Sequence, residues 1–435
     1  MKKKIVCLLL ILTLSCFSLT GCYSTRGLET LAYAVAIGID KGDGNNKLKV
    51  TLQLAVLSDS SSNGGGSTQS QQSTITSVDC SSIDSGISLI NSYISKKVNL
   101  SHCKAVVFSE EFAYGGLSEE IFTFVNNLEV RPNCNIIISR CNALDYLQNV
   151  QPTLESVSAR YYELILNSSE YTAYSQNIAL KDFYNSLLNS SSSPYAILGG
   201  INNKSTQELS TTSSIYDSEG SYKADEAPII SPNGIENMGL AVFSGDKLVG
   251  ELNGAETLSH IIVTNNLKSA IITIPNPYKQ GSVISIYITQ TKKTKSSLEF
   301  VNNYPYITCD ISIAGNVLSL EEGLDYSNAE VVKTLEEYTN SYIKENILSY
   351  LYKEACMNTL NEALCDNIEA HVLSYLYKTA KEYKTDIASF GRLGLKDYLT
   401  WQDWVDSNWA SNYQNSFFSV NVNSTIQSGQ LFTKI

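Results

Sequence analysis

The residue best suited to chemistry lies near the start of the 435-residue chain. Three lysines at positions 2–4 precede an almost wholly apolar stretch over residues 5–19, and the sequence Leu19-Thr20-Gly21-Cys22 follows. A basic start, an apolar stretch shorter than the roughly 20 residues of a spanning helix, and small residues before a cysteine are typical of a signal peptide with a lipobox. We therefore predict a lipoprotein signal peptide over residues 1–21, cleavage before Cys22, and lipidation of Cys22. An ordinary secretory signal with an accidental cysteine is the alternative.

An acylated cysteine would anchor the chain on the outer face of a membrane. Each buried methylene contributes about 0.8 kcal/mol, so several acyl chains hold a protein far more firmly than one myristoyl group does. The longest apolar stretches after the leader, such as residues 32–39, have the length of strands rather than of spanning helices. We therefore expect the lipid on Cys22 to be the membrane anchor.

The other residue types that carry chemistry are too scattered to indicate an active site. The three histidines, His102, His260 and His371, lie in no metal-binding or nucleophile motif. Two acids that could do acid–base work, Asp40 and Glu256, are explained by turn formation and helix capping. We therefore predict no catalytic, cofactor-binding or metal-ligating residue and no enzyme activity.

The cysteines after Cys22 are odd in number and form no CxxC pair, so they do not indicate a disulfide framework. Buried free thiols that pack as small apolar residues are the favoured interpretation, because a metal site would need closer spacing and histidine partners. Pairing of Cys134 with Cys141, or of Cys356 with Cys365, stays open if the chain is oxidised. The seven residues are Cys80, Cys103, Cys134, Cys141, Cys309, Cys356 and Cys365.

The charge balance argues against nucleic acid as a partner. The chain has 31 basic and 43 acidic residues, and removal of the three leader lysines leaves 28 basic residues and a net charge of −15. Such a chain has no electrostatic footprint for phosphate backbones. The one basic run, residues 292–295, is short and lies where we expect a strand to turn.

The first half of the mature chain alternates strand and helix patterns, which predicts a mixed sheet with helices packed on it. It opens with a hairpin, and the serine- and glycine-rich residues 58–77 are predicted to be a flexible loop. We assign residues 22–200 to an N-terminal α/β domain and leave open whether it has two subdomains. The predicted strands are 33–40, 47–57, 105–108 and 135–139, and the predicted helices are 83–98, 117–128, 143–147, 154–166 and 180–188.

A polar linker over residues 201–234 is predicted to precede a C-terminal α+β domain over residues 235–435. Its predicted strands are 238–243, 247–252, 283–290, 298–301 and 306–314, with a helix near Ala255 and a last strand around Phe418, Val420 and Val422. A long helical region that Asn328 can cap contains the hexapeptide LSYLYK twice, at 348–353 and 373–378. The fold class expected is therefore α+β and multi-domain, with mixed β-sheets packed with helices and a C-terminal half of antiparallel sheet and long helices.

Several short motifs, in this order and spacing, resemble the Ger(x)C family of spore germination lipoproteins. The most specific stretch joins residues 239–243, 245–250 and Glu256-Thr257. The other matching segments are Gly21-Cys22, 26–29, 37–42, His102-Cys103-Lys104, 106–111, Arg131-Pro132, 135–140, 152–155, Asp386 and Phe390-Gly391. Two features depart from the family pattern, namely Tyr23 in place of a tryptophan and the size of the polar segments 58–77 and 199–234.

The resemblance implies a non-catalytic lipoprotein subunit of a nutrient germinant receptor in a sporulating bacterium. It implies protein–protein contacts with membrane-embedded A and B type receptor subunits, attachment to the bilayer through palmitate or a related acyl chain on Cys22, and a place on the outer face of the spore inner membrane. No cofactor and no ligand site are implied.

A solute-binding lipoprotein of an ABC transporter is the alternative function. Such a protein would have two α/β lobes joined by hinge crossings and would bind a small molecule in isolation. The antiparallel pattern predicted for the second half favours the receptor subunit.

Overall fold

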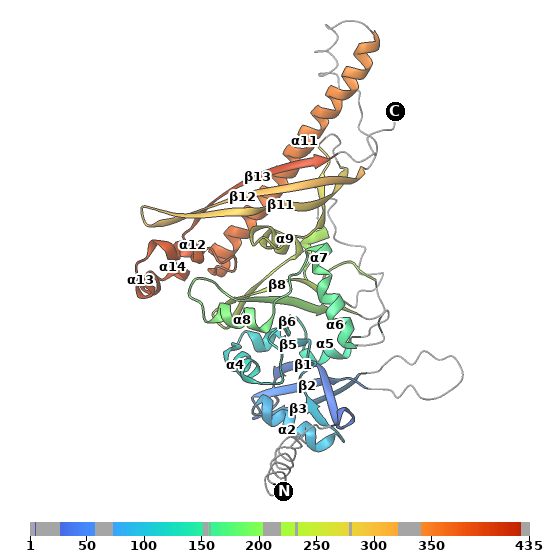
Figure 1. Ribbon diagram of the computed structural model, residues 1–435, viewed down its shortest axis with the longest axis vertical. Helices are drawn as coiled ribbons and strands as arrows, with labels where there is room; N and C mark the ends of the chain where they lie inside the picture. Colours follow the sequence, from blue (N-terminus) through green and yellow to red (C-terminus); the bar gives the residue numbers. More distant parts are fainter. Residues whose placement is uncertain are drawn as a thin grey trace, which may run out of the picture.

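The computed structural model describes residue 5 and residues 27–56, 73–150, 155, 158–202, 219–230, 234–277, 281–320 and 341–427. Cys22 and Asn328 lie outside these residues. The described chain forms two β-sheets, each packed with helices, and the two lie one above the other along the long axis of the molecule (Figure 1). The predicted α+β, multi-domain architecture is confirmed. None of the described helices is both long and apolar enough to cross a bilayer.

The first sheet has nine strands. Its centre is parallel, with order β1-β5-β6-β7, while antiparallel strands β2 and β3 extend one edge, β8 and β9 extend the other, and β4 pairs with the start of β1. The strands are β1 (Leu31–Lys41), β2 (Leu48–Leu54), β3 (Thr74–Cys80), β4 (Lys97–Asn99), β5 (Ala105–Ser109), β6 (Asn135–Ser139), β7 (Tyr195–Ile201), β8 (Ile235–Ser244) and β9 (Lys247–Leu252).

Helices cover both faces of the first sheet, which is why its central strands are continuously apolar. In β5, Val106 and Phe108 belong to one core, and Ala105 and Val107 belong to the core on the opposite face. The first core also contains residues of α2 (Ile83–Tyr93), α3 (Glu110–Ala113), α4 (Ser118–Asn126) and α8 (Leu180–Leu187), and the second contains residues of α5 (Ala143–Gln148) and α6 (Ser158–Asn167). The short elements η1 (Leu28–Thr30), α7 (Ser169–Thr172) and η3 (Glu219–Ser221) complete this half.

Three details of this half differ from the prediction. The hairpin β8–β9, which we assigned to the C-terminal domain, is hydrogen-bonded to β7 in the first sheet. Residues 74–77, predicted to be loop, belong to β3, and Val98, predicted to be helical, lies in β4. In each case a backbone ladder with a distant strand decides the conformation, and local composition does not report such a partner.

The second sheet has the order β10-β11-β12-β13. Strands β11 and β12 are antiparallel, as predicted, and β10, which was not predicted, pairs antiparallel with β11. Strand β13 runs parallel to β12, because the helices between them carry the chain back to the starting end. The strands are β10 (Ala270–Pro275), β11 (Val283–Val301), β12 (Tyr304–Leu320) and β13 (Phe417–Gln427), and the helices are α9 (Gly254–Val263), α11 (Ser341–Tyr377), the π-helical η4 (Lys378–Tyr383), α12 (Gly391–Gly394), η5 (Leu395–Asp397), α13 (Trp401–Asp406) and α14 (Trp409–Tyr413).

The basic run at residues 292–295 does not form a turn, contrary to the prediction. It lies inside β11, where the pairing with β12 shifts register. Thr294 is buried and donates its hydroxyl to the carbonyl of Ile262 over 3.0 Å, while the three lysines of the run are exposed. The run therefore marks an irregularity in one long strand, whose true turn is made by Asn302 and Asn303, both at positive φ.

The second copy of the LSYLYK repeat lies at the end of α11 and the start of η4. Tyr375 in this copy is fully buried in the core of the second sheet, which confirms core packing for that tyrosine. The first copy lies within α11, on the same continuous helix.

Candidate functional site

A cluster of charged side chains lies where the first sheet meets the second half of the chain. Arg140 follows β6, and its guanidinium group lies 2.6 Å from a carboxylate oxygen of Asp225, 2.9 Å from Glu226 and 3.4 Å from Glu251. Lys223 lies 3.0 Å from the second oxygen of Glu251, whose side chain is only 8% exposed. We call these five residues the charged junction.

The charged junction continues into the second half through the end of the long helix. Lys378 donates to both carboxylate oxygens of Glu256, over 2.7 and 2.9 Å, and Tyr383 donates its hydroxyl to the carbonyl of Glu251 over 2.7 Å. Glu256 also closes the capping box of α9, because it accepts the N–H of Asn253 over 2.9 Å. Strand β9, α9 and η4 are thus held together by ionic and polar contacts.

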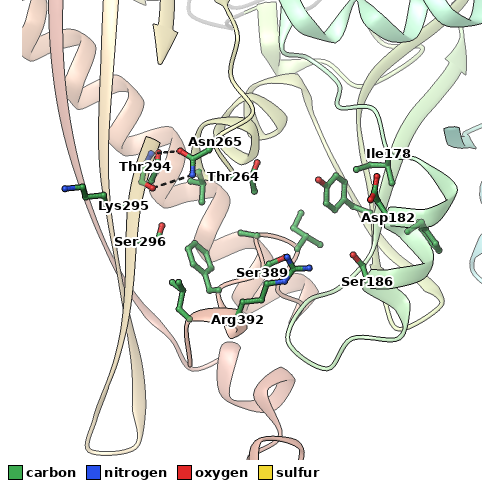
Figure 2. A pocket seen from close by; sticks show the side chains of 17 residues that line it. Ile178, Asp182, Ser186, Thr264, Asn265, Thr294, Lys295, Ser296, Ser389 and Arg392 are labelled. Carbon is green, nitrogen blue, oxygen red and sulfur yellow. Dashed lines mark hydrogen bonds between the residues drawn. The ribbon is translucent and has the colours of Figure 1, made fainter. Parts of the chain in front are cut away.

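A separate cleft of about 660 Å³ opens between the two halves of the molecule, and none of the five residues of the charged junction lines it. Figure 2 shows Asp182 and Ser186 of α8 on one wall, Asn265 and Thr294 on the other, and Arg392 between them. Its charged side chains are exposed, whereas a tight small-molecule site usually buries its few polar groups in an apolar pocket. The cleft therefore resembles a contact surface more than an active site.

Behind this cleft lies a buried carboxylate. One oxygen of Asp386 accepts the N–H of Gly391 over 2.8 Å and the indole N–H of Trp409 over 2.9 Å. The other oxygen has no hydrogen-bond partner among the described residues. Burial raises the pKa of Asp386 from its ordinary value of 3.8 to about 6, against the opposing effect of the two donors.

The three histidines have different surroundings. His102 packs its ring against Tyr33, and His371 lines a separate small pocket beside α9 and α11. His260 is fully buried, its Nδ1 lies 2.7 Å from the Tyr375 hydroxyl, and burial lowers its pKa to about 3. Within the described residues, no three side chains of His, Cys, Asp or Glu gather in a way that could hold a metal ion.

Of the two acids that we assigned to turns and caps, Glu256 caps its own helix, while Asp40 lies within β1 and caps the distant helix α5 instead of forming a turn. Asp40 accepts the N–H groups of Ala143 and Leu144 at the start of α5, over 2.7 and 3.0 Å. Burial raises the pKa of the Asp40 carboxyl, while the two N–H donors oppose that rise. Glu256 caps α9, as described above, and we did not foresee its second bond to Lys378.

The described cysteines are free thiols, as predicted, and four of them are buried. The pairing of Cys134 with Cys141 that we left open is not present: Cys134 lies beside Cys103 with 3.7 Å between the sulfur atoms, and Cys141 contacts Ser139. Cys365 donates to the hydroxyl of Ser424, and the side chain of Cys356 lies outside the described residues. The hydrogen bond to Cys103 and burial raise the pKa of the Cys134 thiol well above its ordinary value, so this thiol is unreactive.

Family models match both halves of the chain. The model "Spore germination protein N-terminal domain" covers residues 24–199, and the model "Spore germination B3/GerAC like, C-terminal" covers residues 238–355 and 349–429. The chain belongs to the Ger(x)C family of spore germination proteins.

Two curated relatives from Bacillus subtilis (strain 168) span most of this Ger(x)C chain. The protein YfkR is 23% identical over 361 residues, which is 81% of this chain and 85% of the relative. Spore germination protein KC is 22% identical over 372 residues, which is 82% of this chain and 85% of the relative. The crystal structure of the GerBC protein is similar with a TM-score of 0.45 and 14% identity, and the match covers 90% of this chain and 96% of that one.

The two family segments of this Ger(x)C protein share one sheet. The N-terminal segment ends inside β7 and the C-terminal segment begins inside β8, and these two strands pair along their length. The charged junction lies at this shared edge, with Arg140 from one segment and Glu251 from the other. Sequence reasoning did not single out these two residues; the available signal was a charged residue directly after the buried strand 135–139.

Asp386 makes this Ger(x)C protein less stable as the pH rises. Because the pKa of the carboxyl is higher in the folded state than in the unfolded state, its stabilising effect is complete below pH 4 and is lost as the pH rises through 6. Asp386→Asn can still accept both hydrogen bonds and cannot ionise. The free energy of unfolding of the variant minus that of the parent should therefore be about 2–3 kcal/mol higher at pH 7 than at pH 4.

Urea unfolding at a series of pH values measures this difference. His260 affects the pH dependence of stability equally in both proteins, so its contribution cancels. Asp406→Asn, an exposed acid on α13, is the control and should leave the pH profile unchanged. A parallel pH profile for Asp386→Asn and the parent would show that the buried carboxyl does not titrate as argued.

Proposed function

We propose that this chain is the lipid-anchored C subunit of a nutrient germinant receptor and is needed for germination in response to nutrients. It works on the outer face of the spore inner membrane, through contacts with membrane-embedded A and B type subunits, and has no catalytic role. The match of both family models, over residues 24–199 and 238–429, carries the proposal. The leader and lipobox before Cys22 support the anchor.

The arrangement of the described residues also supports a binding role rather than catalysis. The polar groups of the charged junction are paired with one another across sequence-distant elements, and a role in holding those elements together accounts for their contacts. The exposed charged side chains of the cleft suit contact with another protein.

Affinity purification from detergent-solubilised spore membranes tests the proposal. A tagged chain should bring down one A type and one B type subunit in near-equal amounts, and strains lacking the chain should fail to germinate on the nutrient of that receptor. Recovery of transporter permeases instead of these subunits would overturn it.

The solute-binding alternative is tested separately by calorimetry of the lipid-free chain against amino acids and sugars. In the part of the second half that the structure describes, the sheet is mostly antiparallel, unlike the second α/β lobe that this alternative requires. We therefore expect no tight binding, and a dissociation constant in the micromolar range or below would favour the alternative.

A further inference from the structure

Two apolar side chains project into solvent at a groove of about 580 Å³ between α2 and α4. Phe122 is 57% exposed and Leu128, directly after α4, is 103% exposed, whereas Val98 and Leu100 beneath them are buried. Lys97 of β4 lines the same groove, is exposed, and forms no ion pair within the described part of the chain. We call Lys97, Phe122 and Leu128 the α2–α4 rim.

The α2–α4 rim lies at the point where the chain enters the fold. Strand β4 pairs with the start of β1, so Lys97 is the partner of Leu31. Eight residues lie between Cys22 and Leu31, three of them in η1, so this length of chain spans roughly 25 Å at most. A bilayer that holds a lipid on Cys22 is therefore within reach of the rim.

We propose that the α2–α4 rim contacts the bilayer itself, with Phe122 and Leu128 inserted at the level of the lipid headgroups and Lys97 against anionic lipid. This inference rests on the lipid anchor proposed above. The contact would orient the anchored domain, so that the second sheet, at the opposite end of the long axis, points away from the membrane (Figure 1).

The exposure of Phe122 and Leu128 suits insertion into a lipid surface. Both side chains project from the surface of the protein, and such side chains can enter the headgroup region. Asp84 and Glu129 also line the groove, and the exposed Lys96 and Lys97 are the side chains at this corner that an anionic headgroup would contact.

A fluorescence experiment tests the contact without using Cys22. The chain from residue 23 onward keeps both described sheets and all their helices, and an N-terminal histidine tag can hold it on vesicles that contain nickel-chelating and anionic lipid. A fluorophore is attached to Leu128→Cys, and lipids with brominated acyl chains quench it if it lies in the bilayer. Tyr304→Cys, on the second sheet and 51% exposed, is the matched control, and the parent chain corrects for labelling of native thiols.

We expect the probe at position 128 to be quenched at least threefold more than the probe at position 304. Phe122→Asp combined with Lys97→Glu should reduce that quenching by more than half. Equal quenching at the two positions would overturn the proposal, and so would quenching that requires membrane-embedded receptor subunits in the vesicles, because the rim would then bind protein. A negative quenching result would not count against lipidation of Cys22, because that modification is measured independently.

Discussion

Cys22→Ala should release the chain from the membrane or leave its signal peptide uncleaved, and germination on nutrients should fall by at least tenfold. The reason is that each buried methylene of the proposed acyl chains contributes about 0.8 kcal/mol to membrane binding. Without acyl chains, retention depends on protein contacts and on weak surface contacts alone. Membrane fractionation of spores, with mass spectrometry of the N-terminal peptide, measures both processing and retention.

Cys16→Ala is the matched control for the anchor, because Cys16 lies in the leader with Thr13, not leucine, three residues before it. This variant should be processed, retained and active like the parent. If Cys22→Ala were retained and supported normal germination, the anchor would be wrong, although family membership would stand on its own evidence.

Arg140→Met should lower the free energy of unfolding by about 3 kcal/mol. The substitution keeps an apolar stem of similar length but removes the cation from three carboxylates, one of which, Glu251, is almost fully buried. An uncompensated charge in such a place costs about 3–5 kcal/mol, and Lys223 offsets part of that cost. Urea unfolding measures the change.

Lys41→Met is the matched control for Arg140, because it breaks an ion pair with Glu111 in which the two side chains are 69% and 67% exposed. Its expected cost is below about 1 kcal/mol. In the double variant Arg140→Met, Glu251→Gln, much of the lost stability should return, since the buried charge is gone as well. A loss no greater than that of the control would mean that the charged junction does not hold the two segments together.

Much of the fold could be read from local patterns. The hairpin β1–β2, the strands β5 and β6, and the helices α4, α5 and α8 lie within a few residues of their predicted positions. Their buried positions recur with the period of a strand or a helix, and this signal is local. Where the conformation depends on pairing with another strand, as in β3, β4 and the basic part of β11, the prediction was wrong.

The sequence by itself determined the alternation of strands and helices and the family, and it alone carries the prediction of a leader and a lipobox at Cys22. Only the tertiary structure decided that β8 and β9 complete the first sheet, that Arg140 meets Glu251, and that Lys97, Phe122 and Leu128 share one groove. These contacts join residues far apart in the chain. They depend on which strand edges and helix faces meet, and no local pattern of residues encodes that choice.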